Sequence, residues 1–321
     1  MTAMINQWNG RLSQDLPKAE PALFTQTVPR HLVHRTAGSE VFVTGLRVTG
    51  HNTFEVGARW PGSHSFYGPI TRDSHDPMLL VECLRQAGLL IAHVAFEVPI
   101  DFMFITHEKR FAVLPAGLRT AGTQPVDILI NVTAHDIRRR GRGFAGMLFE
   151  YRCFRDGMPI ARAAIRWSCV SAAGYARLRG EHLNATSPPV TGCRMVTPEL
   201  VGRRHRRDVV IAHEPERRRA WRVRLDPDHP VIFDHSVDHV PGMAAVEAAR
   251  QAALIVVGRP HALPVAGDFS LHRYVEFDEP CLVHANLDDG IEGGLAVVRV
   301  VLEQGGHTAA EGTLEMLLSG A

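Results

Sequence analysis

Two apolar segments that carry the same three polar residues constrain the fold of this chain most. Residues 73–92 read DSHDPMLLVECLRQAGLLIA, and residues 238–257 read DHVPGMAAVEAARQAALIVV. Glu82, Arg85 and Gln86 follow the helical spacing i, i+3, i+4, so on a helix they share one face. A helix that is apolar on nearly every other side is buried, and a buried carboxylate needs a partner. The first segment therefore predicts a core helix that holds a structural ion pair or lines a site.

The polar face of the first segment recurs in the second at an offset of 165 residues, without a gap. The identical positions are Asp73/Asp238, Met78/Met243, Val81/Val246, Glu82/Glu247, Arg85/Arg250, Gln86/Gln251, Ala87/Ala252 and Leu89/Leu254. Packing alone does not require a glutamate, an arginine and a glutamine inside a buried helix. The repeat therefore favours a role for these three residues in both halves of the chain.

The strands expected around the two helices recur in the same order. Two strand-like runs precede each helix and four follow it, and Asp156-Gly157 predicts a hairpin between the last two runs of the first half. The runs expected after the second helix are DFSLHRYVEF, CLVHANL, LAVVRVVLEQGG and HTAAEGTLEMLL. This recurrence indicates a tandem duplication of one α+β domain.

The predicted fold class is α+β, a tandem hotdog. In each unit a long buried helix is wrapped by a curved antiparallel sheet, and we expect the two units to pair as a pseudo-dimer within the chain. The predicted organisation is a loose N-terminal arm over 1–26, a first hotdog unit over 27–183, a linker over 184–204 and a second hotdog unit over 205–321.

Composition narrows the setting in which the protein acts. The formal net charge is +1, so no global field favours nucleic acid or a membrane surface, and we expect neither as a partner. The five cysteines form no CxxC motif, which indicates neither a disulfide framework nor a zinc site. The N-terminus lacks the features of a secretory signal, so the expected location is cytoplasmic. Arginine-rich runs such as IRRRGRG (137–143) are typical of a solvated face or a docking patch for an acidic carrier protein.

Three motifs resemble those of one known family. FDHSVDHVPGMAAVEAARQA, from Phe233 to Ala252, is similar to the A-factor biosynthesis (AfsA-type) proteins, which make precursors of γ-butyrolactone signals. DPMLLVECLRQAG, from Asp76 to Gly88, resembles the counterpart of that motif in the family's first repeat, and VPRHLVHR, from residue 28, resembles its entry motif. The resemblance runs over residues 28–319.

The resemblance implies an acyltransferase. A β-ketoacyl group would move from acyl carrier protein to the hydroxyl of dihydroxyacetone phosphate, as the first committed step towards a γ-butyrolactone or butenolide signal. This chemistry implies no metal and no redox cofactor. The helix motif resembles more distantly that of hotdog dehydratases, but the catalytic histidine of those enzymes would fall on Phe233 in the second unit and on Gly68 in the first. This departure argues against dehydration.

Attack of an alcohol on a thioester requires a base, and the repeated glutamates are candidates. We expect Glu247 or Glu82 to take the proton, because burial raises the pKa of a carboxyl group while a neighbouring arginine opposes that rise. Arg250 or Arg85 would clamp the phosphate or orient the glutamate. These four residues are the catalytic candidates, and the alternative is that each Glu–Arg pair only ties its helix to the sheet.

A second group of residues is expected to bind the substrates. Gly242 permits close approach to the N-terminus of the second helix, whose N–H groups suit a thioester oxyanion. Gln86 and Gln251 either donate to that oxyanion or satisfy the glutamates. His235 and His239, just before the second helix, are weaker candidates, since such residues are often only part of a loop.

Two rival functions remain open from the sequence. One is another hotdog activity, a thioesterase or dehydratase on acyl thioesters. The other is a non-catalytic protein that binds an acyl chain or a signal. The sequence leaves open the length and branching of the acyl chain, the final signal, the unit that holds the active site, and any assembly beyond the internal pair.

Overall fold

The chain divides into two compact units after Tyr175. Its structure is a computed structural model that describes residues 20–71, 73–141, 143–188, 192–215, 217 and 219–318. Most of the predicted N-terminal arm, residues 1–19, lies outside the described residues. The predicted boundaries of the arm, the units and the linker stay a prediction, as does the side-by-side pairing of the two units.

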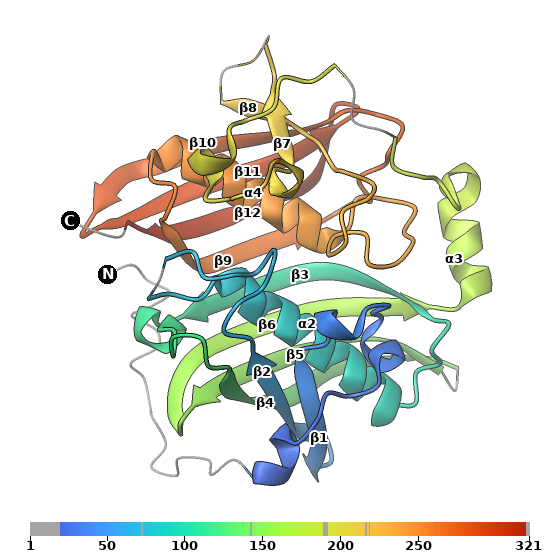
Figure 1. Ribbon diagram of the computed structural model, residues 1–321. Coiled ribbons are helices and arrows are strands. Elements are labelled where there is room, and N and C mark those ends of the chain that lie inside the picture. The colour runs from blue at the N-terminus through green and yellow to red at the C-terminus, as the bar shows by residue number, and fades with distance from the viewer. Residues whose placement is uncertain are drawn as a thin grey trace. The chain divides into compact units, whose positions relative to one another are not determined.

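The first unit combines an antiparallel sheet with a long helix. Its strands are β1 (Val43–Gly50), β2 (Thr53–Trp60), β3 (Met103–Val113), β4 (Val126–Arg140), β5 (Gly143–Arg155) and β6 (Met158–Val170), and its helix α2 (Pro77–Val94) follows β2. The strands lie in the order β1-β2-β4-β5-β6-β3. Figure 1 shows α2 against the sheet of its own unit, where it contacts β1 and β2.

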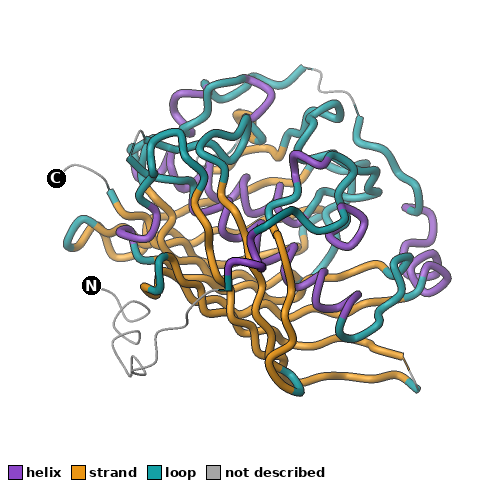
Figure 2. Tube along the Cα trace, turned by 60° about the horizontal axis from the view of Figure 1, so that its bottom comes forward, coloured by secondary structure: helices purple, strands orange, loops and turns teal. Residues whose placement is uncertain are grey.

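The second unit repeats this arrangement strand for strand. Its elements are β7 (Ile211–His213), β8 (Ala220–Val223), α4 (Gly242–Val257), β9 (Leu263–Leu271), β10 (Cys281–Glu292), β11 (Leu295–Gln304) and β12 (His307–Leu317). The order β7-β8-β10-β11-β12-β9 is that of the first unit with each strand replaced by its counterpart. In Figure 2 long strands make up most of the trace, and helices are few. The predicted succession of two strands, one helix and four strands is confirmed in both units.

Both long helices are core helices, as their apolar sequences predict. Almost every residue of α2 is buried, and α4 is buried from Ala244 to Leu254 against β8, β10 and β11. By length and mean hydropathy α2 also passes as a membrane span, but 89% of its 18 residues are buried within the protein. Burial at that level is what a core helix of a folded domain shows.

Tight turns join the closing strands of each unit. Asp156 and Gly157 both have positive φ, 50° and 77°, between β5 and β6, so the predicted hairpin is confirmed. In the second unit Gly305 and Gly306 occupy the corresponding turn between β11 and β12, with φ of 56° and 75°. Two successive residues with positive φ match the right-handed twist of the flanking strands.

One predicted strand is largely misplaced. The run DFSLHRYVEF, residues 268–277, overlaps β9 only over residues 268–271, because β9 begins already at Leu263. The earlier residues Leu263, Val265 and Ala266 are buried, and Leu263 and Ala266 pair with β12, whereas residues 272–277 leave the sheet. Burial and pairing outweigh the poor strand propensity of Pro264 and Gly267.

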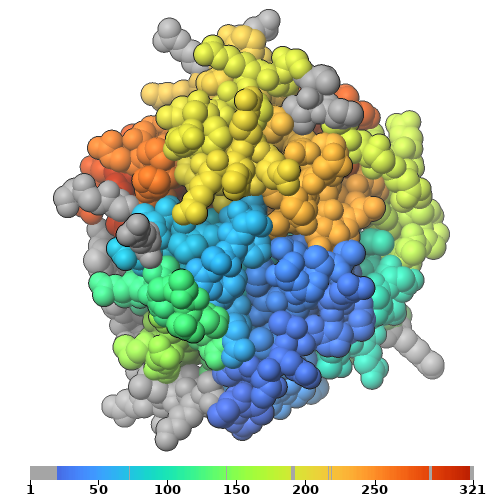
Figure 3. All heavy atoms as spheres, viewed as in Figure 1, coloured from blue at the N-terminus to red at the C-terminus, as the bar shows by residue number. Residues whose placement is uncertain are grey.

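A connecting segment of short helices and strands precedes α4. It contains the 3-10 helices η7 (Pro198–Val201) and η8 (Arg206–Asp208), with their counterparts η3 (Arg30–Val33) and η4 (Gly38–Glu40) in the first unit. In Figure 3 the segment of the second unit, in yellow, forms much of the visible surface of that unit. These segments supply partners for the polar faces of the long helices.

Candidate active site

Glu82 is the centre of a buried polar network in the first unit. Its side chain is fully buried, and Oε1 accepts hydrogen bonds from Arg35 at 2.7 Å, from Arg85 at 2.8 Å and from Gln86 at 2.8 Å. The other oxygen, Oε2, accepts from Nε of Arg85 at 2.9 Å. Two guanidinium groups and an amide therefore surround one carboxylate.

Glu247 has the same surroundings in the second unit. Its Oε1 accepts from Nε of Arg203 at 2.9 Å, from Arg250 at 2.8 Å and from Gln251 at 2.6 Å, and its Oε2 accepts from Nε of Arg250 at 2.8 Å. Glu247 is 2% exposed, and Arg250 and Gln251 are fully buried. The predicted faces Glu82–Arg85–Gln86 and Glu247–Arg250–Gln251 are thus each brought together, with one further arginine.

The glutamine of each face also binds the backbone that leads into the first strand of its unit. In the first unit, the Gln86 amide donates to the Glu40 carbonyl at 2.7 Å and accepts from Phe42 N–H at 2.9 Å. In the second unit, Gln251 makes the matching pair with the Asp208 carbonyl and Val210 N–H, at 2.8 and 2.9 Å. Each network therefore fixes its helix to the segment that contains η4 or η8.

A histidine–carboxylate contact extends each network by one step. His64 Nε2 lies 3.2 Å from Glu40, and His229 Nε2 lies 3.1 Å from Asp208. The Nδ1 atom of each histidine accepts N–H groups of the following turn, which identifies it as the unprotonated nitrogen. The two histidines therefore hold the loops that precede the long helices.

Sequence analysis missed the partners from outside the helices. They are Arg35, Glu40 and His64 in the first unit and Arg203, Asp208 and His229 in the second. A signal for them exists, because His64 and His229 keep the helix offset of 165, while Arg35/Arg203 and Glu40/Asp208 share an offset of 168. Lys109 on β3 is another buried residue that was missed, and burial lowers its pKa to about 8.

The expected rise in the pKa of the buried glutamates is wrong. Burial alone raises the pKa of Glu247, but Arg203 and Arg250, with hydrogen bonds from Arg250 and Gln251, bring it down to about 2. Burial likewise raises the pKa of Glu82, but Arg35 and Arg85 outweigh this effect and bring that pKa well below the usual range. A carboxylate held in this way is charged near neutral pH and is a weak proton acceptor.

The loop before α4 carries a second group of polar side chains. His239 Nδ1 lies 2.8 Å from Asp238 Oδ1, and the His239 ring packs edge-on against Tyr274 with ring centroids 4.5 Å apart. Asp238 is also bound by the buried Arg179, whose Nε donates to Oδ2 at 3.1 Å. His235 contacts its neighbour Asp234 at 3.8 Å and has a 39% exposed side chain. The two candidate histidines therefore differ, since His239 belongs to a network with three other side chains.

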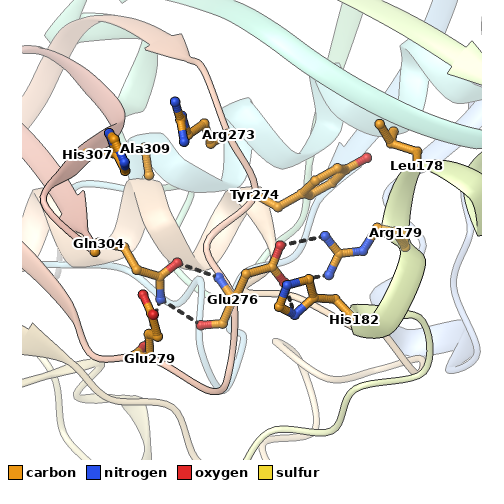
Figure 4. Close-up of a pocket in the computed structure, with 11 residues that line it drawn as sticks. Leu178, Arg179, His182, Arg273, Tyr274, Glu276, Glu279, Gln304, His307 and Ala309 are labelled. Atoms are coloured by element: carbon orange, nitrogen blue, oxygen red, sulfur yellow. Dashed lines mark hydrogen bonds and ion pairs between the residues drawn. The ribbon is translucent and has the colours of Figure 1, made fainter.

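A cavity of about 540 Å³ lies beside this loop in the second unit. Figure 4 shows Arg179 bridged to Glu276, with Tyr274 above them and Arg273 and His307 on another part of the wall. Arg179 holds both oxygens of Glu276, at 2.6 and 2.5 Å, and its guanidinium lies 4.4 Å from the Tyr274 ring centre. The cavity wall thus shares Arg179 and Tyr274 with the Asp238–His239 pair.

The N-termini of α2 and α4 differ in the residues that cap them. Asp76 caps α2 by accepting from Met78 N–H at 2.9 Å, and Pro77 is the first helical residue. At the equivalent positions α4 has Pro241 and Gly242, and a proline has no side-chain group that can cap a helix. Of the described residues, only Leu271 would come as near as 4.0 Å to a Cβ atom placed on Gly242. The start of α4 therefore has more open space than its buried core.

The part of the chain that the structure describes contains no cluster of three or more His, Cys, Asp or Glu side chains placed to hold a metal ion. The polar groups of the two networks are instead arranged around arginine and carboxylate. Such an arrangement holds the backbone segments around each long helix in place.

The sequence as a whole matches a family model described as A-factor biosynthesis hotdog domain, once over residues 16–171 and again over 185–319. The chain belongs to the A-factor biosynthesis family. The resemblance of its helix motifs to this family is therefore confirmed, and the two matches correspond to two hotdog units in tandem.

Relatives in this family match most of the chain. The protein named 2-oxo-3-(phosphooxy)propyl 3-oxoalkanoate synthase from Streptomyces virginiae is 40% identical over 283 residues, 87% of this chain and 94% of that protein. A protein of the same name from Streptomyces coelicolor is 33% identical over 279 residues, 87% of this chain and 88% of its own length.

Solved structures confirm the hotdog fold class. An oleoyl thioesterase structure from Lactobacillus plantarum aligns over 85% of this chain and 99% of its own, with a TM-score of 0.50 and 11% identity. A thioesterase structure from Novosphingobium aromaticivorans DSM 12444 aligns over 86% of this chain and 98% of its own, with a TM-score of 0.51 and 14% identity. At these identities the likeness concerns the fold alone.

Removing the charge of either central glutamate should destabilise the protein strongly. In Glu82→Gln and Glu247→Gln two arginines lose their buried counter-charge, so we expect the free energy of unfolding to fall by about 3 to 5 kcal/mol. Urea unfolding measures this. The control is Asp127→Asn, which breaks the exposed pair with Arg59 and should cost less than about 1 kcal/mol. Equal small losses in all three variants would contradict the structural role of the networks.

The same networks should make the free energy of unfolding depend on pH in the acidic range. The folded pKa of Glu247, about 2, lies below its ordinary value of 4.5, so its contribution is complete above pH 4.5 and is lost as the pH falls towards 2. We expect the unfolding free energy of the wild type to fall over this window, and that of Glu247→Gln to fall less. Parallel slopes for the two proteins, measured by denaturant titration at each pH, would show that Glu247 has no such shift.

Proposed function

We propose that the protein is an acyltransferase that moves a β-ketoacyl group from a thioester to a hydroxyl of dihydroxyacetone phosphate. The observation that carries this proposal is the 40% identity, over 87% of the chain, to a protein named 2-oxo-3-(phosphooxy)propyl 3-oxoalkanoate synthase. The product in that name is an ester of a 3-oxo acid with phosphorylated dihydroxyacetone. Its formation needs an activated acyl group and the phosphorylated alcohol, and the release of a thiol drives the exchange forward.

The second unit is our proposed location of the chemistry. Pro241 cannot cap the start of α4 with its side chain, and we place the developing oxyanion of the thioester at this helix N-terminus, whereas Asp76 caps the matching place at α2. At the offset of 165 residues His239 of the second unit corresponds to Ser74 of the first, so only the second unit has an imidazole at this position.

We propose positioning roles for the residues of the repeated helix faces. Glu247 and Arg250 bind each other and Arg203, and they fix α4 so that its N-terminus is presented to the substrate. Glu82 and Arg85 do the same for α2, and the amide groups of Gln251 and Gln86 extend each network to the backbone. The low pKa of Glu247 supports an orienting role better than that of a general base.

Acyl carrier protein is our proposed acyl donor, and the cytoplasm, where such carriers act, is the proposed location. Exposed arginines at the end of β4, Arg138, Arg139 and Arg140, support docking of an acidic carrier. The side chains of such a patch would steer the encounter more than they would set the affinity. Neither nucleic acid nor a membrane is part of this proposal.

Mass spectrometry of the products tests the proposed reaction. The purified protein is mixed with a β-ketoacyl pantetheine thioester and dihydroxyacetone phosphate, and we expect the ester phosphate together with free pantetheine. Free acid alone, with or without the phosphorylated alcohol, would identify a thioesterase. Tight binding of the thioester without turnover would identify an acyl-binding protein, and both outcomes would contradict the proposal.

A methyl group at the start of α4 tests the location of the site. Gly242→Ala should fold normally, because the added Cβ meets Leu271 only at 4.0 Å and alanine favours a helix. If the substrate occupies this space, kcat/KM for ester formation should fall by about tenfold or more, since a small misplacement of reacting groups is costly. Gly38→Ala, where a Cβ meets nothing within 4 Å, is the control at the start of η4. Unchanged kinetics in Gly242→Ala would place the site elsewhere.

A further inference from the structure

The Asp238–His239 contact has the geometry of an oriented base. The distance of 2.8 Å between Asp238 Oδ1 and His239 Nδ1 is that of a hydrogen bond in which the imidazole donates its Nδ1 proton. In a neutral imidazole this leaves Nε2 as the basic nitrogen. The His239 side chain is 23% exposed, so a substrate can reach the ring.

A buried arginine fixes the carboxylate of this pair. Arg179 is 3% exposed, and it binds Asp238 twice, through Oδ2 at 3.1 Å and through the backbone carbonyl at 2.9 Å. The same guanidinium also donates to both oxygens of Glu276, as Figure 4 shows, and its face lies over the Tyr274 ring. Tyr274 in turn packs against the His239 ring. Asp238 and the imidazole are therefore held from two sides.

Burial favours the neutral form of His239. Burial lowers the pKa of the imidazole below 6.5, Arg179 lowers it further, and Asp238 and Glu276 act in the opposite direction. Tyr274, the remaining titratable group against the ring, has its own pKa raised to about 12 by burial and is neutral. A neutral imidazole near pH 7 is able to accept a proton.

We propose that His239 is the general base of the acyl transfer, with Asp238 and Arg179 as its positioning residues. The inference rests on the proposed function and adds the residue that activates the alcohol. Glu247 is unsuited to this task because both of its oxygens accept hydrogen bonds from arginine. His239 also lies three residues before Gly242, next to the helix N-terminus that would hold the oxyanion.

The proposed step balances without any further reactant. The alcohol oxygen attacks the thioester carbon while its proton moves to His239 Nε2, and a tetrahedral oxyanion forms. When the oxyanion collapses, the C–S bond breaks and the imidazolium returns the proton to the leaving thiolate. Ester and thiol are released, and the imidazole is neutral again.

The first unit keeps Asp73 at the position of Asp238 but lacks the imidazole beside it. Ser74 stands where the second unit has His239, and its backbone pairs with Thr71 and Arg119. The hydroxyl of Ser74 donates to the neighbouring His75 carbonyl at 3.4 Å. His75 is itself buried, and burial lowers its pKa to about 4. The proposal therefore assigns proton transfer to the second unit.

Kinetics of His239→Asn on the full-length protein test the proposal, with 3-oxooctanoyl pantetheine and dihydroxyacetone phosphate as the substrates. Asparagine keeps a donor for Asp238 but cannot accept the proton, so we expect kcat for ester formation to fall by about 100-fold or more with little change in thioester Kd. The control is His272→Asn, which removes an exposed histidine paired with Glu311 at 3.2 Å in the same unit and should leave kcat unchanged.

The outcomes separate this inference from the proposed function. Ester formation by the wild type with less than a threefold loss in His239→Asn would overturn the base assignment and leave the acyltransferase standing. No ester from the wild type would instead overturn the function itself. If His239→Asn fails to bind the thioester, kcat for ester formation is compared with the wild type in His239→Gln and Asp238→Asn instead.

The pH dependence of kcat/KM distinguishes a general base from a residue that only supports the structure. We expect kcat/KM of the wild type to rise with pH along an acidic limb below pH 6.5, where His239 loses its proton. Asp238→Asn removes an anion that raises the pKa of His239, so its limb should shift to lower pH as its rate falls. An unshifted limb in Asp238→Asn, or the wild-type limb persisting in His239→Asn, would contradict the proposal.

Discussion

One buried carboxylate bound by two arginines organises each unit of the protein. A buried carboxylate is tolerated only when its oxygens accept hydrogen bonds. Glu82 and Glu247 obtain their partners from the helix itself and from a segment between two 3-10 helices, far away in the sequence. The glutamine one turn further along the helix then fixes the backbone that leads into the first strand. Helix, connecting segment and sheet edge are thereby held in one arrangement.

The two units share the buried network but differ in the residues at the start of the long helix. The networks keep the same partners in both units, but the residues just before the helices differ, with Ser74, Asp76 and Pro77 in the first unit and His239, Pro241 and Gly242 in the second. The first helix has its N-terminus capped by its own side chain, and the second begins beside an oriented histidine. A duplicated fold can thus keep the same structural network in both copies while only one copy carries the chemistry.

The sequence predicted those features of the fold that depend on a local pattern of residues. The helices, their polar faces and the Asp156-Gly157 hairpin follow from spacing and turn chemistry. Arg35 and Arg203 could not be found in this way, because they lie in short segments without periodicity and meet the glutamates only through the fold. The pKa of Glu247 was misjudged for the same reason, since one arginine was visible in the helix and the second was not.

A structure with a bound substrate analogue tests the central claim most directly. Crystals would be grown with dihydroxyacetone phosphate and a β-ketoacyl pantetheine analogue, in which a methylene group between the sulfur and the acyl carbonyl prevents cleavage, and they would locate the reacting groups. We predict the acyl carbonyl at the N-terminus of α4 beside Gly242, with the alcohol oxygen within hydrogen-bond distance of His239 Nε2. Density for the acyl carbonyl at the N-terminus of α2, beside Asp76 and Pro77, would contradict the assignment of the chemistry to the second unit.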